Sequence, residues 1–525
     1  MPQPLRILAA IALLAAILAW TARDRMNADG MSYIDMAVGA LTHGPHRLVN
    51  GYWSPLYPAL LATAFAITGA GPEARFAAAH GVNWLLVLGC LWAFRRMLRH
   101  GFPDTGLPAF SWMAMGWCLL YLITVAEVTP DMLTALCVLL AAGSACKLMR
   151  GGGPSSYAAL GVLLAAGYYS KAVMFPGALL LIAILALFPL HPQHGRAGAA
   201  VALAAFALVA APLVLLTSKH TGRLTFGETG SLNFAWYVNG VHPHSGWTGG
   251  GDSGQPEHPP RVLAAQPLVL EYAQPVPGTY PLWYAPSYWY KGVSPRISPV
   301  QLAKRLAANA RWYAKLVFLE MGGLLAGLAA LLWIARSNQS LRWPARSQLW
   351  MLLWPLSMLG LYALVNPENR LIGPYLALFW PAAFGLFRGG LPGLAERGIL
   401  LAAILTVAPA LVLRSAEEAA SMARPDDFAV AARLRELGVR PGDRIAVVGR
   451  PFRAFYAHLA GAQVVAEVPE PSQLWTTGQP EILDRIRQTG VRAIVVPDKP
   501  ASAPLPGCEP VRGTRDSFCI IAASR

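Results

Sequence analysis

Apolar runs of about 20 residues recur along most of the chain, and each is long enough to cross roughly 30 Å of hydrocarbon as a helix. Of the 525 residues, 55% are hydrophobic and 13% are charged, and this charged fraction is about half that of a typical soluble protein. We therefore predict an α-helical polytopic membrane protein with about eleven transmembrane helices. The expected spans lie at about residues 5–22, 77–95, 108–126, 131–149, 156–171, 173–190, 197–217, 312–335, 348–365, 371–387 and 398–414.

The formal net charge of +15 comes from 42 Lys and Arg residues against 27 Asp and Glu residues. Because the positive residues lie beside the apolar runs, they indicate membrane topology, and no nucleic-acid partner is expected. With the N-terminus in the cytoplasm, basic groups such as Arg95, Arg96 and Arg99 fall on the inside, as the positive-inside rule requires. This arrangement predicts a multi-pass protein of the inner (plasma) membrane with an extracytoplasmic C-terminal region.

The loops divide the chain into two expected domains, at residues 1–424 and 425–525. The first is a transmembrane domain with a first outer loop at 23–76 and a large outer loop at 218–311. An apolar run from Pro55 to Thr68 lies within the first outer loop. It is short for a crossing and two prolines break its first turn, so we expect it to dip into the membrane without spanning it.

The segment after residue 425 alternates short strands with helices, which is typical of a compact α/β unit. The expected strands and helices lie at 444–449, 463–468 and 493–496, and at 427–437, 452–459 and 480–489, respectively. The segment has no glycine-rich phosphate loop, so we assign it no nucleotide. Cys508 and Cys519 flank a glycine turn between two strand-like stretches, and an extracytoplasmic setting permits oxidation, so we predict a disulfide between them.

Acidic residues are predicted to gather at the outer edge of the bilayer. Asp29 and Asp35 lie near the start of an expected interfacial helix, with Tyr33 between them. Asp131 follows Thr-Pro at another helix start, and Glu127 lies four residues before it. Two acids from different loops suit general acid–base chemistry, but ordinary capping of the two helix starts explains the same patterns.

Two cations are predicted at the same depth as these acids. Lys171 ends one apolar run, and Arg370 starts another directly after Asn-Pro-Glu-Asn, which places Glu368 beside it. Because Arg binds two phosphate oxygens at once and Lys acts as a point charge, the pair suits a phosphate site; snorkelling of Lys171 to the surface is the alternative. Glu320 lies deep in a further run, five residues after Lys315, and we interpret it as a partner for another group within the bundle.

The order of these motifs resembles that of a known family. An N-terminal span is followed by Asp-Gly-Met-Ser-Tyr-Ile-Asp-Met-Ala from Asp29, Trp-Ser-Pro-Leu-Tyr-Pro from Trp53, Thr-Pro-Asp-Met-Leu-Thr from Thr129, Ser-Lys-Ala around Lys171 and Asn-Arg-Leu-Ile-Gly-Pro-Tyr ending at Tyr375. Over about residues 5–415 the chain resembles the GT-C superfamily, and more narrowly bacterial relatives of the protein O-mannosyltransferases and the lipid A aminoarabinose transferases.

The resemblance implies a glycosyltransferase that moves a hexosyl or pentosyl sugar from a polyprenyl-phosphate donor to a lipid, glycan or protein acceptor on the outer (periplasmic) face. Asp29 matches the first-loop acid that takes the acceptor's proton, and Asp131 matches the second catalytic acid. The residues assigned to substrate binding are Tyr33, Asp35, Glu127, Lys171, Glu368 and Arg370, of which Lys171 and Arg370 match the cations that hold the lipid phosphate. No cofactor is assigned, and participation of a divalent metal stays open.

The alternative function is a transporter or flippase of lipid-linked glycans, in which the same charges would line a pathway across the membrane. Transporters commonly show paired halves, whereas this sequence shows no such repeat and its polar residues gather on one side. The large outer loop also carries aromatic rings that suit either a sugar site or a membrane-facing belt. These are Trp236, Tyr237, Trp247, Trp283, Tyr284, Tyr288, Trp289 and Tyr290.

Overall fold

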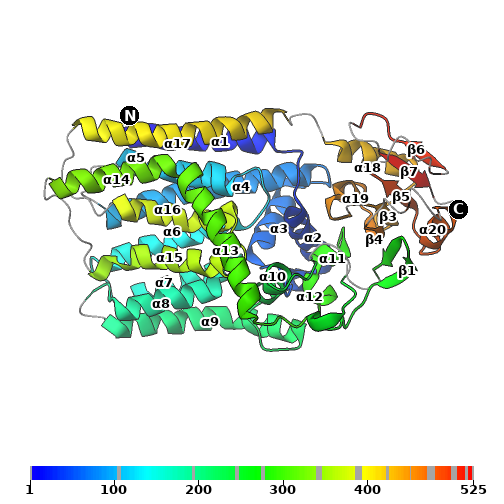
Figure 1. Ribbon diagram of the computed structural model, residues 1–525, viewed down its shortest axis with the longest axis horizontal. Coiled ribbons are helices and arrows are strands. Elements are labelled where there is room, and N and C mark those ends of the chain that lie inside the picture. The colour runs from blue at the N-terminus through cyan, green and yellow to red at the C-terminus, as the bar shows by residue number, and fades with distance from the viewer. Residues whose placement is uncertain are drawn as a thin grey trace.

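The computed structural model is elongated, with a helical bundle at one end and a β-sheet at the other (Figure 1). It describes residues 3–102, 108–191, 195–242, 247–272, 278–337, 346–384, 393–420, 425–449, 451–469, 474, 479–497, 505, 507–514 and 518–522. One hydrophobic core fills the bundle and continues onto one face of the sheet, and a second core lies on the other face. The two cores take alternate residues of the same strands, as the pleat of a sheet requires.

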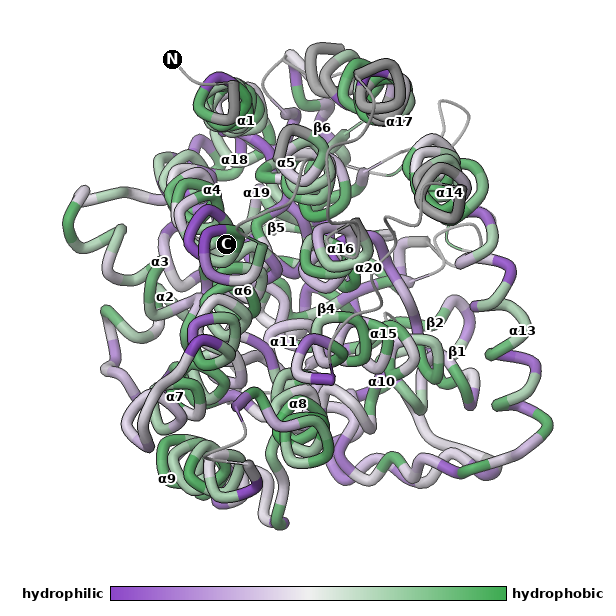
Figure 2. Tube along the Cα trace, turned by 90° about the vertical axis from the view of Figure 1, so that its left-hand side faces the viewer, coloured by the Kyte–Doolittle hydropathy of each residue, from purple (hydrophilic) through white to green (hydrophobic). Residues whose placement is uncertain are grey.

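A helix lies at each position where a membrane span was predicted. These helices are α1 (Gln3–Thr21), α4 (Ala74–Gly101), α5 (Pro108–Trp117) with the π-helical turn η2 (Cys118–Ile123), α6 (Asp131–Leu148), α7 (Pro154–Ser170), α8 (Met174–Leu187), α9 (Gly195–Thr221), α14 (Gly322–Ser337), α15 (Trp350–Ala363), α16 (Asn369–Phe384) and α17 (Gly393–Ala420). Figure 2 looks along the bundle and shows hydrophobic residues on its outer helices, such as α8 and α9.

Three of the described helices, α4, α6 and α9, are long and apolar enough to cross a membrane on their own. A fourth span results if α13 (Pro299–Lys315) with the π-helical turn η4 (Leu316–Glu320) is joined to α14, although a bend of 70° separates them. These helices make the chain an integral membrane protein, whereas the count of eleven spans stays a prediction.

Short helices cover the end of the bundle that faces the sheet (Figure 1). They are α2 (Ala28–His43), η1 (Pro45–Leu48), α3 (Leu56–Thr68), α10 (Thr229–Tyr237), η3 (Gly251–Ser253), α11 (Pro281–Tyr284) and α12 (Pro286–Trp289), while η5 (Arg346–Gln348) precedes α15. The helix predicted in the first outer loop is confirmed by α2, and its interfacial position stays a prediction. Whether α3 dips into the membrane stays a prediction.

The aromatic residues of the large outer loop pack mainly against one another. The ring centroids of Trp236 and Trp283 lie 6.1 Å apart, and those of Trp236 and Tyr290 lie 5.2 Å apart. Six of the eight rings are at most 8% exposed, namely Trp236, Trp247, Trp283, Tyr284, Trp289 and Tyr290. Both expectations for them, a membrane belt and an open sugar platform, are therefore wrong for these six, which form a packed core instead.

Small residues bring α7 and α9 close together. A Cβ on Gly161 would lie 2.2 Å from the carbonyl oxygen of Ala202, and a Cβ on Gly198 would lie 2.5 Å from the ring of Tyr157. Glycine is therefore required at both positions for this approach, which is the usual way in which membrane helices pack. Lys171 directly follows α7 as its C-cap residue, so the packing of α7 against α9 helps to fix the position of the Lys171 backbone.

The sheet has seven strands in the order β1-β2-β4-β3-β5-β7-β6. The strands are β1 (Arg261–Ala265), β2 (Leu268–Glu271), β3 (Arg444–Val448), β4 (Gln463–Val468), β5 (Ala493–Val496), β6 (Cys508–Pro510) and β7 (Cys519–Ala522). β3 is parallel to β4 and β5, and the other pairs are antiparallel. The helices of this region are α18 (Asp426–Glu436), α19 (Phe455–Ala460) and α20 (Gln479–Arg487).

The three strands predicted after residue 425 are confirmed by β3, β4 and β5, and the alternation with helices is confirmed by α18, α19 and α20. The hairpin of β1 and β2 was not predicted. It comes from the large outer loop and joins the sheet where Leu270 pairs with Glu467 of β4. The large outer loop and the C-terminal region therefore share one sheet.

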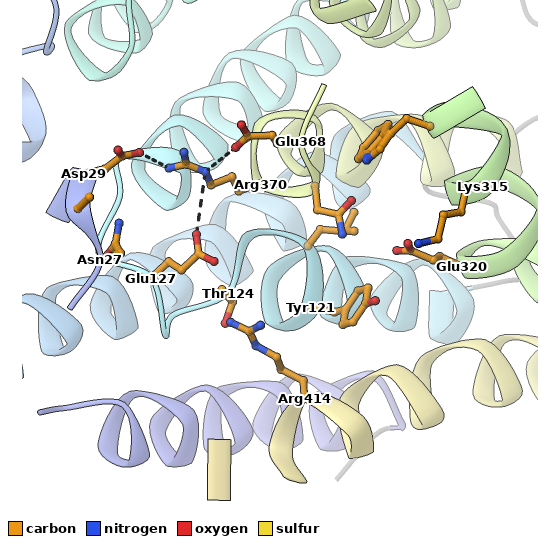
Figure 3. Close-up of a pocket in the computed structure, with 14 residues that line it drawn as sticks. Asn27, Asp29, Tyr121, Thr124, Glu127, Lys315, Glu320, Glu368, Arg370 and Arg414 are labelled. Carbon is orange, nitrogen blue, oxygen red and sulfur yellow. Dashed lines mark hydrogen bonds and ion pairs between the residues drawn. The ribbon is translucent and has the colours of Figure 1, made fainter. Parts of the chain in front are cut away.

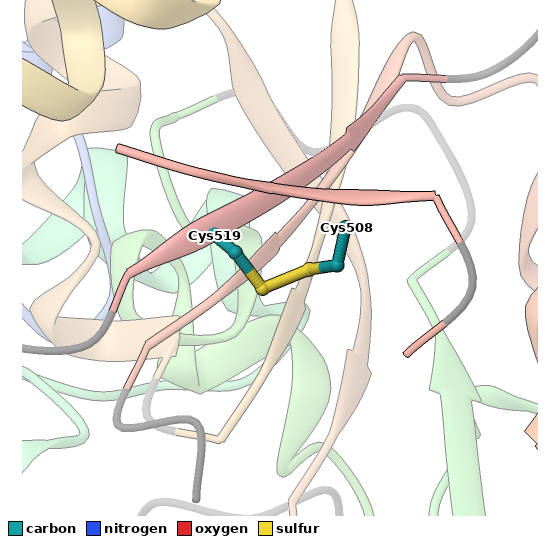
Figure 4. Close-up of a disulfide and its surroundings, with 2 residues drawn as sticks. All are labelled: Cys508 and Cys519. Atoms are coloured by element: carbon teal, nitrogen blue, oxygen red, sulfur yellow. A yellow bond between two sulfur atoms is a disulfide. The ribbon is translucent and has the colours of Figure 1, made fainter. Parts of the chain in front are cut away.

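Cys508 and Cys519 form a disulfide, as predicted (Figure 4). The pair closes a loop with a sequence separation of 11 and links β6 to β7. Replacing both residues by Ser is expected to lower the unfolding free energy of this region by up to about 3 kcal/mol, because the unfolded chain loses a constraint. Denaturant unfolding followed by fluorescence measures this, and the reduced parent should match the variant. Equal midpoints for the oxidised parent and the variant would contradict the expectation.

Asp427, in the first turn of α18 and outside the membrane, makes the unfolding free energy depend on pH. Its carboxylate accepts a hydrogen bond from the backbone nitrogen of Tyr456 at 3.0 Å, but loss of water around it raises its pKa to about 7. Because the unfolded value is about 3.9, the folded state binds more protons between about pH 4 and pH 7, and the unfolding free energy falls as the pH rises through that window. We expect the Tm to fall less steeply with rising pH in Asp427→Asn than in the parent protein. An identical fall in the two proteins would assign the effect to another group.

Candidate active site

Asp29 lies in the first turn of α2 and faces a cation. Its Oδ2 atom lies 2.8 Å from Nη1 of Arg370. The N-cap residue of α2 is Asn27, and neither it nor Asp29 caps the helix with a side-chain hydrogen bond. Asn27 instead accepts a hydrogen bond from the backbone nitrogen of Val128 at 2.8 Å. The capping interpretation of Asp29 is therefore wrong, because its carboxylate is used in an ion pair.

The loop before α6 is held by polar side chains that the sequence analysis did not identify. The ring nitrogens of His80 lie 2.9 Å and 3.0 Å from the carbonyl oxygens of Val125 and Arg25. Asn83 donates from Nδ2 to the carbonyl oxygen of Glu127 at 2.8 Å. Both side chains lie on α4, so this helix fixes the backbone that carries Glu127. Burial raises the pKa of the Glu127 carboxyl, although the nearby Arg370 partly opposes this.

Asp131 lies between two cations at the start of α6. It is 1% exposed, its Oδ1 atom pairs with Nζ of Lys171, and its Oδ2 atom lies 3.7 Å from Nη1 of Arg370. The N-cap residue of α6 is Pro130, and none of the described side chains caps this helix. Capping by Thr129 is therefore wrong. Snorkelling of Lys171 is also wrong, because its ammonium group and the Asp131 carboxylate neutralise each other within the protein.

Arg370, in the first turn of α16, is the centre of the charge cluster (Figure 3). Besides Asp29 and Asp131, its guanidinium group lies 3.1 Å from Glu368 and 4.0 Å from Glu127. Glu368 is held in turn by Asn366, which donates to it at 2.9 Å. The cluster thus brings together six of the residues predicted from sequence, which are Asp29, Glu127, Asp131, Lys171, Glu368 and Arg370.

A cavity of about 640 Å³ opens beside this cluster. It is lined by Asn27, Ala28, Asp29, Tyr121, Leu122, Thr124, Glu127, Trp312, Lys315, Glu320, Glu368, Asn369, Arg370 and Arg414. Arg414 of α17 was not identified from sequence, because it ends an apolar run in the same way as many basic residues that only mark topology. Lys171 and Asp131 are not part of this lining, and Asp131 links Lys171 to Arg370.

Tyr33 and Asp35 lie on α2 but are not brought to the cavity. Tyr33 is buried against Trp53 and Tyr57, with ring centroids 5.1 Å and 5.3 Å away. Asp35 accepts hydrogen bonds from the backbone nitrogen and the hydroxyl group of Thr279 at 2.6 Å and 2.8 Å, and it lies 3.1 Å from Nδ1 of His458. Its contacts therefore join α2 to the large outer loop and to the C-terminal region.

The acidic side chains of the site surround an arginine. Within the part of the chain that the structure describes, no three His, Cys, Asp or Glu side chains come together as they do around a bound metal ion. The guanidinium group of Arg370 instead lies within 4.0 Å of four carboxylates. We therefore assign no metal ligands among these residues.

No family model and no curated protein matches the sequence. Among solved structures, ArnT from Cupriavidus metallidurans bound to undecaprenyl phosphate aligns over 98% of this chain and 98% of its own, with a TM-score of 0.57 and 12% identity. The archaeal oligosaccharyltransferase AglB from Archaeoglobus fulgidus, in complex with an inhibitory peptide and a dolichol-phosphate, aligns over 94% of this chain and 69% of its own, with a TM-score of 0.51 and 12% identity. At such identities the likeness concerns the fold. This chain therefore adopts the GT-C fold that ArnT and AglB share, as its motifs predicted.

Proposed function

We propose that this protein transfers a sugar from a polyprenyl-phosphate donor to an acceptor hydroxyl group on the outer face of the membrane. The observation that carries the proposal is the pairing of Asp29 with Arg370 at the edge of the cavity, next to the buried pair of Asp131 and Lys171. The fold is that of proteins whose structures hold undecaprenyl phosphate and dolichol-phosphate, which supports a lipid-phosphate ligand.

Arg370 would hold the donor phosphate directly, Lys171 would add a positive charge next to it through its pair with Asp131, and Asp29 would act as the general base. In this step the acceptor oxygen bonds to the anomeric carbon while the bond from that carbon to the phosphate oxygen breaks. The acceptor's proton passes to Asp29, and the bonding electrons leave with the phosphate. Attack from the face opposite the phosphate inverts the configuration at the anomeric carbon. Asp131 would keep both cations in position.

Donor binding would also free the Asp29 carboxylate to act as the base. Without a ligand the carboxylate of Asp29 is paired with Arg370 at 2.8 Å, so it is not free to accept a proton from an acceptor. A phosphate that binds Arg370 competes with Asp29 for the same guanidinium group. The exchange would release Asp29 only when a donor is present, which favours an ordered reaction with the donor bound first.

Incubation of the purified protein with radiolabelled polyprenyl-phosphate sugars tests the function. Appearance of label on a hydroxyl-bearing lipid, glycan or protein, together with free polyprenyl phosphate, supports glycosyl transfer. A transporter reconstituted in vesicles would instead move the intact lipid across the membrane without discharging it. Intact donor after incubation with acceptors of all three classes would reject the proposed enzyme.

The proposed outer location of the site requires a particular topology. We propose that α3 does not cross the membrane, so that Gly71 lies outside and position 97 at the inner end of α4 lies inside. A cysteine introduced at position 71 should then react with a membrane-impermeant maleimide in intact cells, and one at position 97 should react only after permeabilisation. The reverse pattern of labelling would refute this topology.

A further inference from the structure

The end of the cavity away from Asp29 has no role in the reaction described above. Trp312 and Lys315 of α13 and Glu320 at the end of η4 line it, and we call these three residues the α13–η4 lobe. Figure 3 shows the side chains of Lys315 and Glu320 directed toward each other, on the opposite side of Arg370 from Asp29. The lobe lies where the helix turns by 70°, and π-helical turns of this kind are frequent at functional sites.

Glu320 brings a buried acceptor atom into this lobe. Its Oε2 atom is buried and has no hydrogen-bond partner in the described part of the chain. A buried acceptor without a donor is unfavourable, and carboxyl groups in apolar helices are rare unless they have a function. The role of Glu320 as a partner within the bundle therefore leaves this oxygen unused. A bound ligand with a hydrogen-bond donor would supply it.

We propose that the α13–η4 lobe binds a sugar ring. Hydroxyl groups of a sugar would donate to Glu320, the ammonium group of Lys315 would donate to sugar oxygens, and the indole of Trp312 would cover the apolar face of the ring. This inference rests on the proposed glycosyl transfer and adds the position at which carbohydrate is held.

The ring belongs either to the donor or to a glycan acceptor, and two binding experiments on the purified full-length protein separate these sources. The first compares bare undecaprenyl phosphate with undecaprenyl-phosphate hexose and pentose. For a donor sugar, we expect Glu320→Ala to weaken binding of the sugar-bearing lipids by about 10- to 100-fold and to leave bare undecaprenyl phosphate unchanged. Glu320→Gln should recover part of the affinity, because its amide oxygen still accepts hydrogen bonds. The second experiment measures soluble methyl glycosides and oligosaccharides, whose binding weakens instead if the acceptor occupies the lobe.

Matched variants separate the lobe from general effects on the fold. Glu257→Ala removes an exposed carboxylate that pairs with Lys291 at 2.9 Å outside the cavity, and Trp333→Leu removes an indole that is 78% exposed on α14. Neither should change any of the affinities, whereas Trp312→Ala should weaken the same ligands as Glu320→Ala. If the lobe variants keep the parental affinity for every sugar while the parent protein discharges its donor, the proposed sugar site in the α13–η4 lobe is wrong and the proposed function stands. A parent that neither binds undecaprenyl phosphate nor discharges a donor overturns both.

Discussion

Asp29→Asn is expected to lower kcat for sugar transfer by about 10²- to 10⁴-fold, because Asn keeps the shape of the side chain but does not accept a proton from the acceptor. The KM for the donor should not rise. Arg370 keeps its contact with Glu368 at 3.1 Å, and it loses the carboxylate that competes most closely with a donor phosphate. Steady-state kinetics with a fixed acceptor measure both constants.

The same substitution separates chemistry from folding. Asn27, not Asp29, is the N-cap residue of α2, so the helix start should be unaffected. Asp24→Asn is the matched control, because Asp24 lies in the same outer segment, pairs with Arg23 at 3.7 Å and does not line the cavity. The control should keep the parental kcat. If Asp29→Asn folds normally and also transfers sugar at the parental rate, Asp29 is not the base.

The charge cluster was predictable from sequence because its members are charges at the ends of apolar runs. Such residues must find partners in a membrane protein, and motifs on the same side of the membrane meet there. The pairing itself was not predictable: Asp131 binds Lys171 and also approaches Arg370 because α6, α7 and α16 pack together. Asn83 gives no distinct signal either, because a neutral polar residue within an apolar run resembles many others.

Asp35 shows where motif-based assignment fails. It lies in the same motif as Asp29, six residues later on α2. Because an α-helix has 3.6 residues per turn, residues six positions apart point in different directions. Asp35 meets Thr279 and His458, which are distant in sequence. The hairpin of β1 and β2 was missed for the same reason, since its partner strand β4 lies far along the chain. Contacts of this range depend on the tertiary fold and leave no local pattern.

Arg370→Gln is expected to reduce both stability and donor binding. The guanidinium group lies within 4.0 Å of Asp29, Glu127, Asp131 and Glu368, so its removal leaves these carboxylates to repel one another. Breaking a buried ion pair costs about 3–5 kcal/mol, and the lower end applies here because the Arg370 side chain is 23% exposed. The loss of a charge-assisted contact to phosphate should weaken donor binding by about 1.5–3 kcal/mol. Thermal unfolding in detergent and binding of undecaprenyl phosphate measure the two effects.

Two further variants separate the two effects of Arg370→Gln. Arg370→Lys keeps the positive charge among the carboxylates but loses the bidentate hydrogen bonding of the guanidinium group. Compared with Arg370→Gln, it should therefore regain most of the stability but only part of the donor affinity. The double variant Asp29→Asn with Arg370→Gln removes one of the repelling carboxylates. It should therefore be more stable than Arg370→Gln alone, and the coupling free energy between the two positions reports their ion pair. Additive effects of the two substitutions on stability would show that the contact between Asp29 and Arg370 is not energetically significant. Parental affinity of Arg370→Gln for undecaprenyl phosphate would remove Arg370 from the phosphate site.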